Sequence, residues 1–257
     1  MKVKLIAWNK LGEDNSRKIV ILAVKVSCGK VREKGIDYYI ERNYSDEDYR
    51  KWLIDALKYP SVLEHLVFTF YIEGISRVCS HQLVRHRLAS YTQESQRYSE
   101  SYMKKAVEKV AHICSKKLEE NYDYYSRLIE EFLKIAEEKQ GEYRNLVIAA
   151  AQEAFVIPWS LSLKEKYCLA RSYLESLAEY YRLLAKGVRK EDARFIIPQA
   201  IKTALIMTVN LRELLHIAKL RLSNTAQWEI RELVKRMVEE ASKIVPEITN
   251  LIKSYRE

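Results

Sequence analysis

Apolar residues at helical spacing dominate this chain, and they constrain it to a fold with far more helix than strand. The clearest case is 163–186, whose apolar stripe ends at Gly187, a residue type that commonly terminates helices. A second long helical stretch covers about 104–151, and Gly141 is expected to divide it into a hairpin. Shorter helices are expected over residues 46–58, 75–86, 211–219 and 226–244.

Three short runs have the character of strands. Lys2–Trp8 alternates between polar and apolar residues, whereas 66–72 and 201–209 are rich in β-branched and aromatic residues. Gly74 is expected to end the second run, and the Val- and Ile-rich segment 17–26 fits helix or strand. The sequence therefore predicts an α+β fold, in which a helix-rich single domain surrounds a small, mainly antiparallel sheet.

The charge balance favours anionic partners. Lys and Arg number 44 against 35 Asp and Glu, which leaves a formal net charge of +9, but the two signs are interspersed and form no basic tail. No signal peptide or membrane-spanning run is recognisable, and the four widely spaced cysteines indicate neither a zinc site nor a disulfide framework. We therefore expect a cytoplasmic protein without a membrane partner.

The densest polar segment runs from Arg85 to Tyr98. Its three arginines suit a nucleotide, because guanidinium groups bind phosphate bidentately and stack on rings. The alternative is that the cations at 85–87 only complement the dipole at the end of a helix. Residues 90–99 contain no Gly or Pro and few apolar residues, which favours a loop that a ligand orders.

A second polar group flanks the helix expected at 211–219. Arg212 and His216 lie four residues apart, Asn210 precedes the helix, and Arg221 follows its expected end. The alternative for the pair on the helix is a solvated flank with a satisfied histidine. The group becomes informative only together with the other polar clusters.

Two further features are ambiguous by themselves. Ser61 and Glu64 fit a helix cap, although a cap hydroxyl can also face a ligand, and Arg194 fits a surface charge. The chain contains no Gly-rich phosphate loop, and no paired histidines with a nearby glutamate indicate a metal site. Ser95 has no base beside it in the sequence, so we expect a hydrogen-bond donor there rather than a nucleophile.

Taken in order, these clusters resemble the flavin-dependent thymidylate synthase family. The diagnostic pattern of that family is Arg-His-Arg, seven residues and Ser, which is found here as Arg85-His86-Arg87 and Ser95. The resemblance covers 1–103 and about 150–245. Further matching blocks lie at 61–70, 193–198, 208–212, 220–221 and 226–230, and departures from the usual pattern are Val62, Thr92 and Thr225.

The resemblance implies the reductive methylation of dUMP to dTMP. Methylenetetrahydrofolate would supply the carbon, FAD would carry the reducing equivalents, and NADPH would reduce the flavin. The family resemblance also implies a homotetramer whose active sites are shared between subunits. Nucleic acid and membranes are not expected as partners.

The same resemblance assigns roles to individual residues. The dUMP site would be lined by Gln82, Arg85, Glu94, Ser95, Gln96, Arg97, Arg194 and Arg221. FAD would contact Ser61, His86, Arg87, Leu88, Gln93, Asn210, Arg212 and His216. Arg221 is the catalytic candidate, because a cation at the pyrimidine edge stabilises the charge that develops when N3 loses its proton. No metal ligand and no cysteine nucleophile are expected.

The helical stretch at about 104–151 is longer than in the typical family member, which indicates an inserted helical hairpin within a catalytic domain spanning 1–257. Two other functions remain open. A basic helical nucleic-acid-binding protein would show affinity for DNA or RNA that falls steeply with salt. An inactive family member would bind nucleotide and flavin without forming dTMP.

Overall fold

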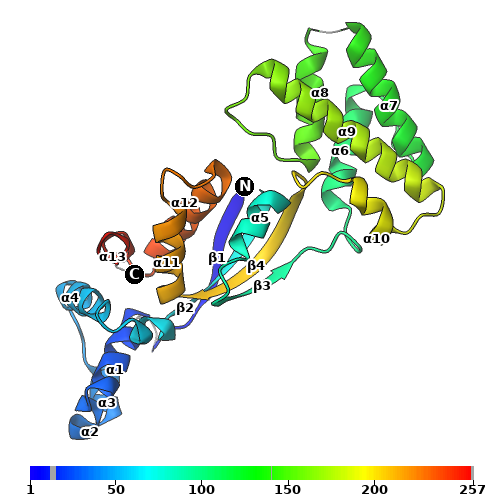
Figure 1. Cartoon of the computed structure of the whole chain (residues 1–257). Helices are drawn as coiled ribbons and strands as arrows, with labels where there is room; N and C mark the ends of the chain where they lie inside the picture. The colour runs from blue at the N-terminus through cyan, green and yellow to red at the C-terminus, as the bar shows by residue number, and fades with distance from the viewer. Residues whose placement is uncertain (12–15, 140, 256–257) are drawn as a thin grey trace. The chain divides into compact units, whose positions relative to one another are not determined.

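The structure is a computed structural model that describes residues 1–11, 16–139 and 141–255. The chain divides into two compact units. The first unit comprises Met1–Glu73, His81–Thr92 and Ala204–Glu257, and the second comprises Gly74–Ser80 and Gln93–Thr203. The predicted α+β class with excess helix is confirmed, because a small antiparallel sheet is accompanied by many more helical residues (Figure 1).

Four strands form the sheet in the order β1-β2-β4-β3. They are β1 (Lys2–Trp8), β2 (Val67–Ser76), β3 (Ala89–Gln93) and β4 (Lys202–Asn210). β1 pairs antiparallel with β2, from Lys2 opposite Glu73 to Trp8 opposite Phe68. In β2 the side chains of Phe68, Phe70 and Ile72 are buried and alternate with partly exposed residues, as expected for a strand with one covered face.

In the first unit, helices cover the sheet and extend beyond it. They are α1 (Arg17–Ser27), α2 (Lys30–Lys34), α3 (Ile36–Glu41), α4 (Asp46–Ala56), the 3-10 helix η1 (Pro60–His65), α11 (Leu211–Arg221), α12 (Trp228–Ser242) and α13 (Ile248–Ser254). α12 packs against β1, and α11 packs against η1, α12 and α13. The ambiguous segment 17–26 is helical, with Val20 and Ile21 facing the core. Ser45 and Asp48 form the reciprocal capping box that starts α4.

α11 begins where β4 ends, with no connecting residue between them. Asn210 is the last residue of β4 and the N-cap of α11, and its Oδ1 accepts from the backbone N–H of Glu213 at 2.9 Å. The backbone N–H of Leu211 donates to the Leu66 carbonyl at 2.7 Å. The start of α11 is therefore held by side-chain and main-chain hydrogen bonds.

The second unit is built mainly from helices. They are α6 (Ser101–Ile113), α7 (Tyr122–Lys139), α8 (Tyr143–Ala154), α9 (Leu163–Ala185), α10 (Lys190–Ala193) and the 3-10 helix η2 (Arg194–Ile196). α9 packs against α7 and α8, and α6 packs against α8, around buried side chains such as Phe132 and Tyr180. The helix predicted at 163–186 is confirmed as α9.

The stretch 104–151 contains parts of three helices, so the prediction of a two-helix hairpin is wrong in this detail. A break between α6 and α7 was not predicted because it lacks Gly and Pro. Ser115 takes a φ of 54°, and the Asn121 side chain accepts from the backbone N–H of Asp123 at 2.9 Å. A polar residue in the left-handed region and an Asn cap therefore end one helix and start the next.

The segment around Gly74 also differs from the prediction. β2 passes through Gly74, whose φ of 75° glycine adopts at little steric cost, and ends at Ser76. The helix expected at 75–86 is therefore the shorter α5 (Arg77–Leu83). The Ser76 hydroxyl accepts from the backbone N–H of Cys79 at 3.0 Å, which caps the new helix. None of the helices in the described part of the chain is long and apolar enough to span a bilayer.

Candidate functional site

The Arg85-His86-Arg87 motif follows α5, and its three side chains have different environments. His86 is only 5% exposed, whereas Arg85 and Arg87 are exposed. The chain turns directly after α5. In this turn the His86 backbone N–H donates to the Leu83 carbonyl at 3.1 Å. The Tyr91 hydroxyl on β3 lies 3.0 Å from the Leu83 carbonyl and 2.9 Å from that of His86, and donates to them. The motif therefore places one buried imidazole between two accessible guanidinium groups.

His86 is the centre of a partly buried polar group that we call the His86 cluster, formed by His86, Tyr91, Glu213, His216 and Arg221. Arg221, the last residue of α11, donates from Nε to His86 Nε2 at 3.0 Å. His86 Nδ1 lies 3.8 Å from Glu213 Oε1. The rings of His86 and His216 meet edge to face, with centroids 6.1 Å apart. Three sequence-predicted site residues, His86, His216 and Arg221, thus come together.

Burial controls the protonation of this cluster. Burial, reinforced by the charges of Arg221 and His216, lowers the pKa of His86 from 6.5 to about 4. Burial raises the pKa of Glu213, against the attraction of His216 and Arg212. Burial and the neighbouring Glu213 raise the pKa of Tyr91. His86 is therefore neutral near pH 7, which agrees with its role as an acceptor for Arg221.

Protonation of His86 should make folding stability depend on pH. Its pKa is about 4 in the folded state and 6.5 when unperturbed, so the unfolded chain takes up the proton first as the pH falls. The contribution to the free energy of unfolding is complete above pH 6.5 and is lost towards pH 4, by about 3 kcal/mol. Denaturant titrations over this range should show the slope in the wild type and in His81→Gln, which changes an exposed histidine.

The variant His86→Gln should lack that slope. The raised pKa of Glu213 works in the opposite sense, since its contribution is lost as the pH rises, but it is present in all three proteins and cancels in the comparison. An unchanged pH slope in His86→Gln would contradict the assignment of a buried, neutral imidazole.

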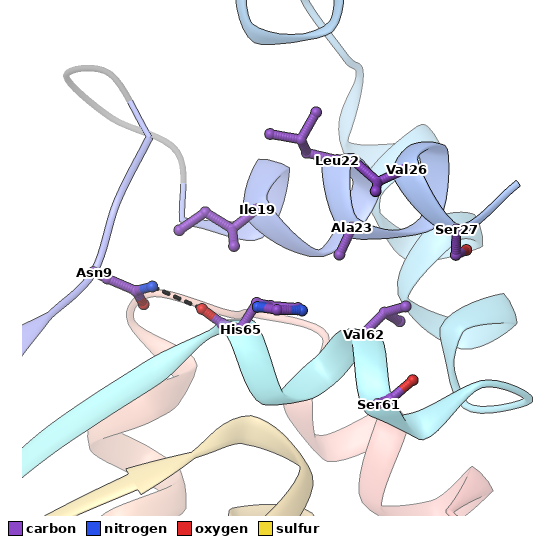
Figure 2. A pocket seen from close by; sticks show the side chains of 9 residues that line it. All are labelled: Asn9, Ile19, Leu22, Ala23, Val26, Ser27, Ser61, Val62 and His65. Carbon is purple, nitrogen blue, oxygen red and sulfur yellow. Dashed lines mark hydrogen bonds between the residues drawn. The ribbon is translucent and has the colours of Figure 1, made fainter. Parts of the chain in front are cut away.

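A pocket of about 510 Å³ lies in the first unit beside Ser61. Figure 2 shows α1 on one side, with Ile19, Ala23 and Val26, and η1 on the other, with Ser61, Val62 and His65. Ser61 is not the helix cap that the sequence suggested, because Pro60 already starts η1 and Tyr59 takes the cap position without a side-chain bond. The Ser61 hydroxyl instead lines a mainly apolar pocket.

Three further FAD-binding candidates lie on or near α11 and β3, and each has a different environment. Arg212 forms an ion pair with Glu64 of η1, so Glu64 is not part of a capping box with Ser61. Asn210 uses its side-chain oxygen to cap the helix. Leu88, which precedes β3, is 64% exposed. These positions combine one paired cation, one amide whose oxygen caps a helix and one exposed apolar side chain.

Most of the remaining candidates belong to the second unit. Gln93 donates from Nε2 to the hydroxyls of Ser80 at 3.0 Å and Thr203 at 3.2 Å. Glu94 accepts from the hydroxyls of Ser99 and Ser101. Gln96 lines a cavity of about 10 Å³. Gln82, of the first unit, is half-buried on α5.

Residues 90–99 were expected to form a loop, but the first part of the segment is strand β3. Pairing beside β4, more than 100 residues away, stabilises it, and no local pattern revealed that pairing. After β3, the Ser95 hydroxyl accepts from the backbone N–H of Arg97 at 3.3 Å. Among the described residues no side-chain base hydrogen-bonds to Ser95.

Arg97 and Arg194 converge on Glu191. Arg97 Nη1 lies 4.0 Å from Glu191 Oε2, and Arg194 Nε donates to the Glu191 carbonyl at 3.1 Å. Arg77, which the sequence did not single out, donates from Nη2 to the Glu94 carbonyl at 3.0 Å, while its Nε is buried with no hydrogen-bond partner among the residues that the structure describes. Burial and the nearby Arg194 lower the pKa of Arg77. This part of the second unit is therefore rich in guanidinium groups.

Potential metal ligands and cysteines complete the description of the site. In the ranges that the structure describes, no three His, Cys, Asp or Glu side chains come together to hold a metal ion. The four cysteines are free, and none belongs to the His86 cluster. Sequence reasoning missed Glu213, although it lies three residues before His216 and eight before Arg221 on α11. That spacing, close to one helix face, was the available signal.

Comparison with known proteins covers nearly the whole chain. Residues 4–247 match the family described as thymidylate synthase complementing protein. The flavin-dependent thymidylate synthase of Sulfurisphaera tokodaii is 36% identical over 250 residues, which cover 96% of this chain and 76% of that protein. The enzyme of the same name from Sulfolobus acidocaldarius is also 36% identical, over 96% of this chain and 75% of its own length.

A solved structure shares the fold. The flavin-dependent thymidylate synthase of Helicobacter pylori, determined with FAD and dUMP, superposes with a TM-score of 0.63 at 20% identity. The match covers 95% of this chain and 97% of that one. Together with the sequence match, this establishes that the chain belongs to the thymidylate synthase complementing protein family, the family of the flavin-dependent thymidylate synthases.

Proposed function

We propose that this chain is a flavin-dependent thymidylate synthase that converts dUMP to dTMP by reductive methylation. The family match over residues 4–247 carries the proposal, because it spans every residue expected to contact nucleotide or flavin. We further propose that methylenetetrahydrofolate donates the carbon and that NADPH reduces the flavin. Relatives named as flavin-dependent thymidylate synthases support this reaction class.

We also propose a cytoplasmic homotetramer whose active sites are shared between subunits. Residues 1–257 would act as one catalytic domain with a helical elaboration at about 104–151. Two highly exposed aromatic side chains support shared sites: Tyr98 is 80% exposed beside Arg97, and Phe195 is 86% exposed beside Arg194. Large aromatic groups are favoured in protein interfaces, and here they adjoin the proposed nucleotide-binding arginines.

The residues proposed to hold FAD fit its chemistry. The exposed guanidinium of Arg87 suits the pyrophosphate, Leu88 offers apolar surface to a ring, and Ser61 opens onto the 510 Å³ pocket. When bound, FAD supplies hydride chemistry that no amino-acid side chain performs. The proposed FAD contacts are Ser61, His86, Arg87, Leu88, Gln93, Asn210, Arg212 and His216.

The proposed dUMP residues provide both charge and hydrogen bonds. Arg97 and Arg194 each leave guanidinium N–H groups available to a phosphate, since the contacts to Glu191 engage only part of each fork. Ser95 can donate its hydroxyl hydrogen while accepting from the Arg97 backbone. The complete proposed set is Gln82, Arg85, Glu94, Ser95, Gln96, Arg97, Arg194 and Arg221.

Arg221 is the residue that we propose to be catalytic. Its Nε donates to His86, and no group among the described residues hydrogen-bonds to Nη1 or Nη2, which leaves donors on both terminal nitrogens for the pyrimidine edge. When N3 of dUMP loses its proton, negative charge spreads over the ring and its carbonyl oxygens. A pre-aligned guanidinium in a water-poor site stabilises that charge and thereby activates C5 as a nucleophile.

The proposal predicts a yellow protein that makes dTMP. Purified protein loaded with FAD should convert dUMP under anaerobic conditions when methylenetetrahydrofolate and NADPH, or chemically reduced flavin, are supplied. Formation of dTMP is scored by chromatography against reactions that lack each component. Protein that takes up no FAD would refute the proposal, whereas FAD and dUMP binding without dTMP would identify an inactive family member.

A further inference from the structure

The hydrogen bond from Arg221 shows which nitrogen of His86 carries the proton. Arg221 Nε is always a donor, so His86 Nε2, 3.0 Å away, must be the acceptor. A neutral imidazole has one N–H group, and with Nε2 accepting, that group is at Nδ1. The contact with Arg221 is therefore available in only one of the two neutral tautomers of His86.

Glu213 is the carboxyl group that faces the protonated nitrogen. Its Oε1 lies 3.8 Å from His86 Nδ1, and its side chain is 7% exposed. Glu213 is in the first turn of α11, where Asn210 caps its backbone N–H. Burying a carboxyl group is costly, and none of the described lysines or arginines forms an ion pair with Glu213 to offset the cost. Glu213 faces the His86 N–H, and His216, Arg212 and Tyr91 are the other charged or polar groups near it.

We propose that Glu213 is a positioning residue for Arg221, acting through His86. Its carboxyl oxygen favours the proton on Nδ1, which keeps Nε2 free to accept from Arg221 and fixes the direction of the guanidinium. An acceptor that holds an imidazole in one tautomer is a known device of catalytic sites, in which the acceptor itself takes no proton. The consequence for catalysis rests on the proposed function, whereas the tautomer of His86 does not.

Two substitutions separate this role from a merely structural one. Glu213→Leu removes the carboxyl oxygens but introduces an apolar group of similar size, which removes the cost of burying a carboxyl group that no described lysine or arginine pairs with. Glu213→Gln keeps a carbonyl oxygen that can face Nδ1. We expect Glu213→Leu to retain the wild-type melting temperature or exceed it, while kcat for dTMP formation falls about tenfold. The KM for dUMP should change less than about twofold, and Glu213→Gln should stay within about threefold of the wild-type kcat.

A double substitution tests whether Glu213 acts through His86. If it does, Glu213→Leu should have little further effect on kcat in a His86→Gln background, because the group that transmits the effect is gone. Multiplicative losses of kcat in the double variant would show that the two residues act independently, and would overturn the proposal.

A readout that needs no turnover is the ¹⁵N NMR spectrum of histidine-labelled protein, in which His86→Gln identifies the His86 signals. The wild type should show a protonated Nδ1 and an unprotonated Nε2, and Glu213→Leu should show a mixture or the opposite tautomer. A wild-type His86 protonated at Nε2, or a Glu213→Leu variant with unchanged tautomer and kcat, would overturn the proposal. An inactive wild type with the expected tautomer would instead refute the proposed function alone.

Discussion

Replacing Arg221 with alanine should slow dTMP formation by about 10²–10³-fold, the usual cost of removing a donor aimed at developing charge. The effect should fall mainly on kcat, because charge builds on the pyrimidine only as N3 is deprotonated. Arg221→Lys should recover part of the rate at most. A lysine is a single point charge and cannot contact both His86 and the pyrimidine edge as a planar fork does.

Loss of Arg221 should also affect folding slightly, since His86 Nε2 would be buried without a donor at a cost of about 1–3 kcal/mol. Steady-state kinetics with FAD-loaded protein should therefore be measured alongside thermal unfolding. Arg50→Ala, which removes an exposed arginine from α4, is the matched control and should keep the wild-type rate. A folded Arg221→Ala protein with full turnover would show that the catalytic assignment is wrong.

Replacing Phe132 with alanine should lower the free energy of unfolding by about 3–5 kcal/mol. Phe132 is fully buried on α7, where that helix packs against α9, and the substitution would leave a ring-sized cavity in the helical core of the second unit. The helices between residues 104 and 151 contribute many residues to this core. A large decrease in the free energy of unfolding would show that residues 104–151 form part of a folded core and are not a surface addition.

Chemical denaturation followed by circular dichroism measures the effect. Lys134→Ala changes an exposed residue of the same helix and should alter the free energy of unfolding by less than about 0.5 kcal/mol. If Phe132→Ala and Lys134→Ala had similar effects, the helices of the second unit would not share the tightly packed core that the structure shows.

Local patterns predicted the parts of the fold that local forces determine. The apolar stripe of α9 and the start of α4 depend on residues a few positions apart, and both helices were expected from the sequence. β3 could not be predicted in this way, because its stability comes from pairing next to β4, which is distant in the chain. The same pairing explains why a segment that resembled a ligand-ordered loop is partly a strand.

For the candidate site, the sequence identified residues but not their environments. The Arg85-His86-Arg87 motif was recognised as a unit, yet only His86 is buried. Glu213 was missed because an acidic residue in the first turn of a helix usually complements the helix dipole at the surface. Its importance depends on the fold, which brings α11 beside the segment that follows α5 and turns Glu213 towards an imidazole 127 positions earlier in the chain.

The direct junction of β4 with α11 has a consequence for how this protein can vary in length. No loop separates the two elements, so no flexible segment can compensate for a residue inserted into or deleted from β4. One missing residue would exchange the two faces of the strand and turn α11 by about 100° about its axis. Arg221, about 16 Å along that helix, would swing away from His86. Natural length variation among relatives should therefore be rare between 202 and 221 and should collect in the loops that join the helices of the second unit.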